Sequence, residues 1–388
     1  MTGSQQSKSV IVVALGATQT LAWASSYYIP AILAAPIADT LDLGASWFFG
    51  AFSAALLVAA FFGPAVGRTI DRQGGRGVLC LSNLVLAAGL AVLSFATGPI
   101  TLLAAWGILG FGMALGLYDA AFASLTAIYG REARSAITGI TLIAGFASTI
   151  GWPVSAYLNE VLGWRETCLV WSACHLVLGL PVNFLALPSG SSFSKPATTT
   201  ATAGPAVGWN PRREMFLLAF VFAAAWTVTG GMAAHLPALL ERAGASPVEA
   251  IAAAALVGPA QVGARMIEFA LLRHTHPLVA ARVATVLHPI GAAFLGLFGP
   301  IAAIGFTLLY GAGNGLLTIA RGTLPLAIFG PQSFGERTGL LGAPARITQA
   351  FAPFVFGVLL EMLGVHLIVV SAALCLSALA ALLCLRKT

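Results

Sequence analysis

The residues of this chain that can do chemistry are the few ionisable ones inside its long apolar segments. Two are carboxylates, Asp119 and Glu268, and three are arginines, Arg265, Arg321 and Arg346. An ionisable group at membrane depth is costly and usually faces a partner or an aqueous cavity. Guanidinium groups bind carboxylates through paired hydrogen bonds. Three arginines against two carboxylates therefore predict a cavity that attracts a small organic anion.

Each arginine also has a structural interpretation. Arg265 is about two turns from the predicted end of its segment and could extend to the interface. Arg321 could pair with Asp119, because the two align within one position when the halves of the chain are compared. The protonation of a carboxylate depends on its burial and on nearby cations. Opening and closing such a contact could couple proton uptake to a conformational change, and Glu268 is a second candidate for proton coupling.

Neutral polar and aromatic side chains in the same segments complete the predicted substrate site. Aromatic residues at membrane depth are more often packing than ligand contacts, and His235 could either carry a proton or be a hydrogen-bonded core residue. The candidates are Trp23, Tyr27 and Tyr28 in the first apolar segment, His235 in the seventh, Asn314 in the tenth and Gln349 in the eleventh.

The composition places the chain in a membrane. It is 59% hydrophobic and 8% charged, with a mean hydropathy of +0.92, whereas a soluble domain carries about 25% charged residues. One bilayer-spanning helix needs roughly 20 apolar residues, so 388 residues accommodate about a dozen. The net charge of +6 is dispersed between apolar segments and does not indicate nucleic-acid binding. No nucleotide-binding loop or metal-ligand spacing is found. The sequence therefore predicts that the protein is not an enzyme and binds no metal or cofactor.

The apolar segments predict an all-α membrane protein with twelve transmembrane helices in two pseudo-symmetric six-helix bundles. Residues 1–188 form the predicted N-terminal bundle and residues 214–388 the C-terminal bundle. Residues 189–213 are rich in Ser, Thr, Ala, Pro and Gly, which predicts a flexible linker. The predicted spans are 10–36, 45–68, 77–97, 99–129, 135–161, 166–188, 215–240, 248–272, 278–298, 300–329, 338–363 and 365–385.

An internal repeat supports the two bundles. Short matches recur in the same order about 200 residues apart, and two similar membrane halves are a known arrangement for transporters. The matches include Thr138 with Thr338, Pro153 with Pro353, Trp23 with Trp226, and Pro30 with Pro237. Of the basic residues assigned to loops, only Arg165 and Arg242 lie opposite the side that holds both termini. The positive-inside rule then predicts cytoplasmic termini and linker, in a plasma membrane such as the bacterial inner membrane.

One loop carries a specific motif. Gly67, Asp71, Arg72, Gly74 and Arg76 are spaced as in G-x-x-x-D-R-x-G-x-R-x-x-L, between the second and third predicted spans. This pattern resembles the signature of the major facilitator superfamily, and the twelve spans, the linker and the repeat agree with it. The resemblance implies a carrier that works by alternating access.

In that family the motif latches the two halves while the cavity faces outward. Gly67 would allow close helix approach. Asp71 would stabilise the N-terminal dipole of an adjacent helix, expected to begin near Gly339. Arg131 and Arg134 would complete the charge cluster. The alternative is that these charges only set topology. The corresponding loop of the second half, at Arg273 and His274, is a weaker candidate latch.

Arg265 follows Gly263 in a G-x-R pattern that resembles the eighth span of the monocarboxylate and oxalate:formate branch. The branch's acidic D-x-x-G-R ending is absent, and Phe269 stands where its glycine would be. The expected function is proton-coupled transport of a small monocarboxylate-like anion by a monomer, with protons and the bilayer as its other partners.

Two alternatives stay open. A proton-driven efflux antiporter for drugs or toxic compounds would usually carry an arginine in span four, and none is present. Its G-x-x-x-G-P pattern in span five is matched only loosely by Gly145, Gly151 and Pro153. A membrane receptor that senses a ligand without moving it would need a larger linker or tail for signalling.

Overall fold

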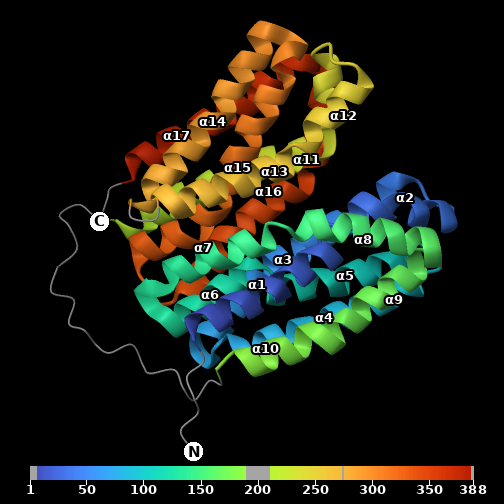
Figure 1. Cartoon of the computed structure of the whole chain (residues 1–388), viewed down its shortest axis with the longest axis vertical. Coiled ribbons are helices and arrows are strands. Elements are labelled where there is room, and N and C mark those ends of the chain that lie inside the picture. Colours follow the sequence, from blue (N-terminus) through green and yellow to red (C-terminus); the bar gives the residue numbers. More distant parts are fainter. Residues whose placement is uncertain (1–6, 189–209, 273–274, 386–388) are drawn as a thin grey trace, which may run out of the picture. The chain divides into compact units, whose positions relative to one another are not determined.

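The computed structural model of the chain describes residues 7–188, 210–272 and 275–385. All regular elements in these ranges are helices (Figure 1). The α-helices are α1 (Lys8–Ser25), α2 (Pro30–Thr40), α3 (Ala45–Gln73), α4 (Gly75–Ser94), α5 (Pro99–Gly116), α6 (Tyr118–Tyr129), α7 (Ala133–Ala144), α8 (Ala147–Leu162), α9 (Trp164–Cys174), α10 (Leu180–Ala186), α11 (Pro211–Arg242), α12 (Pro247–Ala255), α13 (Val257–Ile267), α14 (Pro277–Phe298), α15 (Ala303–Phe329), α16 (Phe334–Leu363) and α17 (Leu367–Cys384). Short 3-10 turns are η1 (Gly130–Glu132), η5 (Gly299–Ala302) and η6 (Gly364–His366), and π turns are η2 (His175–Gly179) and η4 (Glu268–Leu272).

Nine helical runs in the described part of the chain are long and apolar enough to cross a membrane. Three of them contain 51 to 64 residues: Pro99–Leu162, Pro277–Phe329 and Phe334–Cys384. At 1.5 Å per residue each would extend about 75 Å or more, over twice the roughly 30 Å of a hydrocarbon core. Each is divided by a turn that begins at a glycine with positive φ, namely Gly130, Gly299 and Gly364. If each of these three long runs is counted as two spans, the nine runs give twelve spans. This confirms the predicted all-α membrane fold.

The chain divides into two compact units. Unit 1 contains residues 1–198 and 330–343, and unit 2 contains residues 199–329 and 344–388. The first part of α16 therefore belongs to unit 1, and the rest of that helix to unit 2. Helix α11 begins at Pro211, inside the interval predicted as linker, and most of that interval lies outside the described residues.

Small residues bring the helices of each unit close together. In unit 1, Gly110 of α5 faces the backbone of Ala55 in α3 without room for a side chain. In unit 2, a Cβ atom at Gly315 of α15 would lie 2.5 Å from the carbonyl oxygen of Gln261 in α13. Helix association in lipid depends on such close backbone contact, because lipid tails give apolar side chains no reason to cluster.

Several spans of unit 1 are interrupted within the membrane. Span one is broken between α1 and α2, and span four is broken at Leu117, whose extended backbone separates α5 from α6. A break frees backbone groups that must find other partners in lipid. Gln19 Nε2 donates a 2.5 Å hydrogen bond to the carbonyl of Gly116 and so satisfies one of them.

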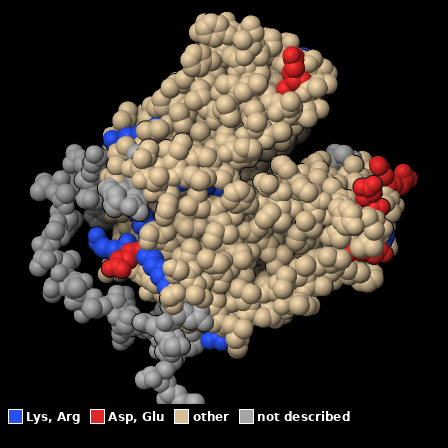
Figure 2. All heavy atoms as spheres, viewed as in Figure 1, with Lys and Arg blue, Asp and Glu red and all other residues tan. Residues whose placement is uncertain are grey.

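The two units repeat one crossing in their first and fifth spans. In unit 1, Thr20 Oγ1 donates to the carbonyl of Ile143 at 3.4 Å, from α1 to α7. In unit 2, Thr348 Oγ1 donates to the carbonyl of Ala223 at 3.2 Å, from α16 to α11. Thr20 and Ala223 are 203 positions apart, and Ile143 and Thr348 are 205 positions apart, both close to the repeat of about 200. Figure 2 shows that most of the visible surface is uncharged, with Lys, Arg, Asp and Glu side chains confined to a few places.

Candidate functional site

The motif residue Gly67 lies at a crossing of four glycines in unit 1. Gly63 and Gly67 of α3 face Gly335 and Gly339 at the start of α16, and the backbones leave no room for a Cβ atom at Gly67 or Gly335. A Cβ at Gly339 would be 2.6 Å from the carbonyl oxygen of Gly63. Both pairs have the four-residue spacing that places small residues on one helix face. The crossing therefore tolerates no side chain larger than hydrogen.

Asp71 caps the helix that crosses there. Its Oδ1 accepts a 2.8 Å hydrogen bond from the amide of Gly335, and its Oδ2 accepts a 2.9 Å bond from the amide of Glu336. A carboxylate at a helix N-terminus satisfies free amides and is stabilised by the helix dipole. The predicted cap is thus present, but α16 begins at Phe334, five residues before the expected Gly339.

Two basic residues at this end of unit 1 have defined contacts. Arg68, which sequence reasoning left out of the latch, pairs with Glu336 at 3.2 Å. Arg76 lies over the ring of Phe184 at 4.0 Å. The motif's remaining members also lie near this end of the unit. They are Gly74, which ends α3 with a φ of 82°, the exposed Arg72 and Arg131, and the half-buried Arg134.

Of the weaker latch predicted in the second half, Arg273 and His274 lie outside the described residues. His276 caps α14 instead, where its Nδ1 accepts a 3.2 Å hydrogen bond from the amide of Leu278.

An aromatic cluster occupies the breaks of spans one and four in unit 1. The ring centroid of Trp23 is 5.1 Å from Tyr27, 5.9 Å from Tyr28 and 4.9 Å from Tyr118. The indole Nε1 of Trp23 is buried and has no hydrogen-bond partner among the described residues. We call these four residues the aromatic cluster. The structure thus brings together all three aromatic candidates and adds Tyr118.

Asp119 lies next to this cluster. It is the second residue of α6 and is 9% exposed. The amides of Ala120 and Ala121 bond to the carbonyl of Leu117, which begins the helix directly after the break. The N-terminal end of α6 stabilises a negative charge at this position. Asp119 therefore belongs to unit 1, whereas its predicted partner Arg321 belongs to unit 2.

In unit 2, Arg265 reaches from α13 to α15. Its Nη2 donates to Gln261 Oε1 at 3.2 Å and to Thr318 Oγ1 at 3.4 Å, and its Nε donates to the carbonyl of Gly315 at 3.4 Å. Because α13 and α15 lie close together at Gly315, the side chain of Arg265 spans only a short distance between them. Arg265 is 4% exposed, so it does not extend to the interface as one interpretation had it.

Arg321 lies over an indole ring. Its Cζ is 4.6 Å from the ring centroid of Trp226 in α11, a cation–π geometry. Asn314, Thr318 and Arg321 are four and three residues apart, so they share one face of α15. Thr229 of α11 donates to Asn314 Oδ1 at 3.1 Å. Two arginines and a row of neutral polar groups thus meet along one stripe of α15.

The other predicted site residues of unit 2 are on neighbouring helices. Arg346 and Gln349 of α16 are 8% and 5% exposed. His235 Nε2 is 2.7 Å from the carbonyl of Pro353, which links α11 to α16. Glu268 is 2% exposed and begins the π turn η4. All five charged residues predicted at membrane depth are therefore buried.

Sequence reasoning missed a buried hydrogen-bond chain in unit 1. His175, the first residue of the π turn η2, has Nε2 at 2.7 Å from Ser25 Oγ and Nδ1 at 2.9 Å from Asn83 Oδ1. Gly179 leaves no room for a Cβ atom beside Asn83 Oδ1. Asn83 Nδ2 donates to the carbonyl of Leu79 at 2.8 Å. This hydrogen-bond chain links α1 to α4 through η2. In the sequence, only the polar residue types in these helices indicated it.

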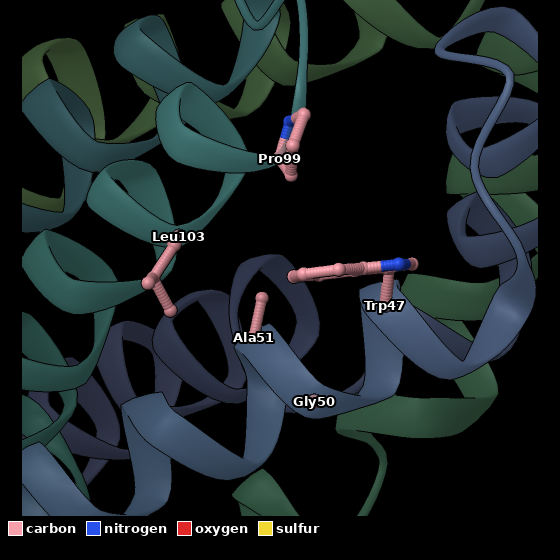
Figure 3. A pocket seen from close by; sticks show the side chains of 5 residues that line it. All are labelled: Trp47, Gly50, Ala51, Pro99 and Leu103. Carbon is pink, nitrogen blue, oxygen red and sulfur yellow. The ribbon is translucent and has the colours of Figure 1, made fainter.

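A hollow on unit 1 has no chemistry of this kind. It lies between the first turns of α3 and α5 and is lined by Trp47, Gly50, Ala51, Pro99 and Leu103 (Figure 3). No charged side chain lines it, and Trp47 is 59% exposed. It is not the predicted anion site.

Comparison with known proteins identifies the family. The sequence model of the Major Facilitator Superfamily matches residues 15–325, and the chain belongs to that family. It is therefore a multi-pass membrane transporter of some small molecule and not an enzyme.

Two individual proteins are similar along most of their length. A protein of Thermoproteus tenax, described as "Uncharacterized 38 kDa protein in 23S RNA operon", is 27% identical over 359 residues, which is 90% of this chain and 88% of the relative. The crystal structure of the human organic anion transporter MFSD10 (TETRAN) superposes with a TM-score of 0.73. It covers 97% of this chain and 100% of the human chain at 16% identity, a likeness that shows the fold.

Proposed function

We propose that the chain is a secondary active transporter of a small organic anion that works by alternating access. The observation that carries this proposal is the burial of Arg265, Arg321 and Arg346 in unit 2, at 4%, 7% and 8% exposure. Insertion scales place the cost of an arginine at the centre of a membrane helix at about 2.5–3.5 kcal/mol. A negatively charged ligand bound by all three arginines would offset this cost of burial within the unit.

The geometry of two of these arginines fits a carboxylate. Arg321 lies over the ring of Trp226, with Cζ 4.6 Å from the ring centroid. Arg265 is oriented by Gln261 and Thr318. A planar fork held in place binds a carboxylate by two parallel hydrogen bonds with little further loss of freedom. Asn314, Gln349 and His235 supply neutral polar groups on the helices around them.

The crossing at Gly67 and the cap at Asp71 act as the gate in this proposal. The cap joins α3 to the start of α16 through charge-assisted hydrogen bonds to Gly335 and Glu336, which form and break without moving apolar surface into water. Arg72, Gly74, Arg76, Arg131 and Arg134 lie at the same end of unit 1. A latch of this kind gives two states of similar energy, which alternating access requires.

Proton coupling is assigned to Asp119, with Glu268 as a second candidate. Asp119 is a buried carboxylate at a helix break, next to an aromatic cluster and in the unit that lacks the buried arginines. Its gain and loss of a proton would change the charge of unit 1 at that break.

The finer assignments belong to the same proposal. Residues 1–188 and 214–388 form the two bundles with a linker at 189–213, the termini and linker are cytoplasmic, and the protein works as a monomer in a bacterial inner membrane. The monocarboxylate and oxalate:formate branch is the proposed place within the family. The human neighbour is described as an organic anion transporter, which agrees with this cargo but at 16% identity does not carry the argument.

A ligand screen of the purified protein tests the cargo class. Thermal unfolding is measured with carboxylates, with phosphate and with lipophilic cations, for the native chain and for Arg346→Ala. Arg242→Ala, at the exposed end of α11, is the matched control. Ligands that bind only the folded state raise the unfolding temperature. Stabilisation by carboxylates that Arg346→Ala loses and Arg242→Ala keeps supports the proposal. Stabilisation by hydrophobic cations alone would instead favour a proton-driven efflux antiporter.

A further inference from the structure

The hollow between α3 and α5 lies wholly within unit 1 and has a volume of about 370 Å³. Its lining has no charged side chain and consists of Trp47, Gly50, Ala51, Pro99 and Leu103. In Figure 3 the carbon end of the Trp47 ring points toward Leu103 and Ala51, and the ring nitrogen lies at the opposite end. The hollow thus presents hydrocarbon groups from both helices.

Backbone amides beside the hollow are already engaged within the protein. Thr101 Oγ1 accepts hydrogen bonds from the amides of Thr97 and Gly98, at 2.9 and 3.1 Å. Pro99 has no amide hydrogen. The amide of Trp47 donates at 2.9 Å to the carbonyl three residues before it. None of these groups is left to bind a polar ligand, so this edge favours an apolar occupant.

The hollow is continuous with apolar surface that contacts the bilayer. Trp47 and Leu103 line it and are themselves exposed, at 59% and 50%. Ile100, in the first turn of α5, is 83% exposed, and Phe95, between α4 and α5, is 71% exposed. Large apolar side chains exposed together mark a contact surface, and on a membrane transporter that contact is with lipid. Tryptophan is enriched where the hydrocarbon core meets the headgroups, the level expected for the first turn of a span.

We propose that this hollow binds the hydrocarbon tail of a membrane phospholipid. An empty apolar hollow loses dispersion contacts along its lining, and water placed there would lack polar partners. A phospholipid tail is apolar, flexible and abundant at this surface, and it needs no hydrogen bond. The tail packs between the first turns of α3 and α5. Helix α3 carries Gly67 and Asp71 at its other end, so the lipid contacts the helix that bears the motif. This inference does not depend on the cargo.

Gly50 allows the hollow to be filled by the protein itself. A Cβ atom at Gly50 would have no neighbouring atom within 4 Å, so Gly50→Leu extends into the hollow without displacing backbone. Gly305→Leu is the matched control. Gly305 is exposed in the first turn of α15, has equally open space and does not line the hollow.

Native mass spectrometry counts the bound lipid. The full-length protein is reconstituted in vesicles of palmitoyl-oleoyl phosphatidylcholine and extracted in a mild detergent, and the phospholipids retained by each chain are counted. We expect the native chain and Gly305→Leu each to retain one phospholipid more than Gly50→Leu does. Trp47→Ala, which removes the exposed wall of the hollow, should lose the same lipid.

Other results would overturn the proposal. Equal lipid counts for the native chain and Gly50→Leu, or an equal loss in Gly305→Leu, would show that the hollow holds no lipid of its own. A dimer of the native chain that Gly50→Leu abolishes would identify a second copy as the occupant. If Gly50→Leu does not fold, Trp47→Ala decides, and a lipid count equal to that of the native chain would contradict the proposal. The cargo is tested separately, by Arg346→Ala.

Discussion

Asp71 Oδ1 accepts a 2.8 Å hydrogen bond from the amide of Gly335, the second residue of α16. Because that part of α16 belongs to unit 1 and the rest to unit 2, this bond acts on a helix that is shared by both units. A carboxylate that caps a helix N-terminus contributes through hydrogen bonds and through the dipole, and loss of the charge removes the dipole term and weakens the hydrogen bonds.

We expect Asp71→Asn to loosen the start of α16. An amide keeps one acceptor atom, so one of the two caps and the charge are lost, at a cost of about 1–3 kcal/mol. Hydrogen exchange at the amides of Gly335 and Glu336 should accelerate by roughly tenfold or more. Asp42→Asn is the control, because Asp42 has a φ of 51° that asparagine also tolerates. Unchanged exchange at both amides would remove Asp71 from the gate.

The glycine crossing gives a second test. Gly67→Ala puts a Cβ atom against the carbonyl of Gly335, and backbone on both sides prevents a local adjustment. Gly77→Ala adds the same atom at a position with nothing within 4 Å. We expect Gly67→Ala to lower the unfolding temperature by several degrees or to change transport. Gly77→Ala should be neutral, or slightly stabilising because alanine is the better helix former by up to about 1 kcal/mol. Similar behaviour of the two variants would contradict the close crossing.

The contact between Arg321 and the ring of Trp226 gives a third prediction. Arg321→Lys keeps the positive charge but loses the flat contact with the indole and the paired donors. If the cargo is held by that fork, the affinity for carboxylates should fall by about tenfold, in line with a cation–π and bidentate loss near 1–2 kcal/mol. Arg242→Lys, at an exposed helix end, should bind as the native chain does. Retained affinity in Arg321→Lys would show that only charge matters there.

The hydrogen-bond chain at His175 predicts a stability effect without a change in cargo. His175→Leu leaves Asn83 Oδ1 without its His175 partner, whereas Ser25 keeps its bond to the carbonyl of Leu21. A buried unsatisfied group costs about 1–3 kcal/mol. The unfolding temperature should drop by several degrees, while the relative affinities for different carboxylates stay as they were. His366→Leu, in the exposed turn η6, should leave stability nearly unchanged. A variant at His175 as stable as the native chain would refute the structural role of this chain.

Much of this fold could be predicted because its determinants are local or repeated. Length and hydropathy gave the twelve spans, and the spacing of Gly67 and Asp71 gave the motif and its helix cap. The sequence placed the start of that helix near Gly339, but the helix begins directly after Ser333. Ser333 has a φ of 48°, which its residue type does not indicate. Positive φ at a serine depends on the surrounding turn, which sequence alone does not specify.

The contacts of the site depend on register and were harder to predict. Short sequence matches gave a repeat of about 200 positions, which placed Asp119 and Arg321 at nearly the same height in spans four and ten. In the structure Arg321 lies over the ring of Trp226, and this contact could not be read from the sequence matches. The break at Leu117 was also missed, since no proline or charged residue marks it. The carbonyl of Gly116 beside the break is satisfied by Gln19 from another helix, a contact that sequence spacing does not reveal.

The last prediction concerns Asp119, whose charge can be removed with little change in packing at the break. Asp119→Asn keeps the shape and the polarity of the side chain, so the fold should persist. It removes the only proton-binding function proposed for unit 1. In proteoliposomes with an imposed pH gradient, uptake of the anion should then lose its dependence on the gradient, while exchange of anion for anion continues. Glu160→Gln, at an exposed position of α8, should keep the full response to the gradient. If pH-driven uptake survives in Asp119→Asn, the coupling proton binds elsewhere, and Glu268→Gln becomes the variant that must abolish it.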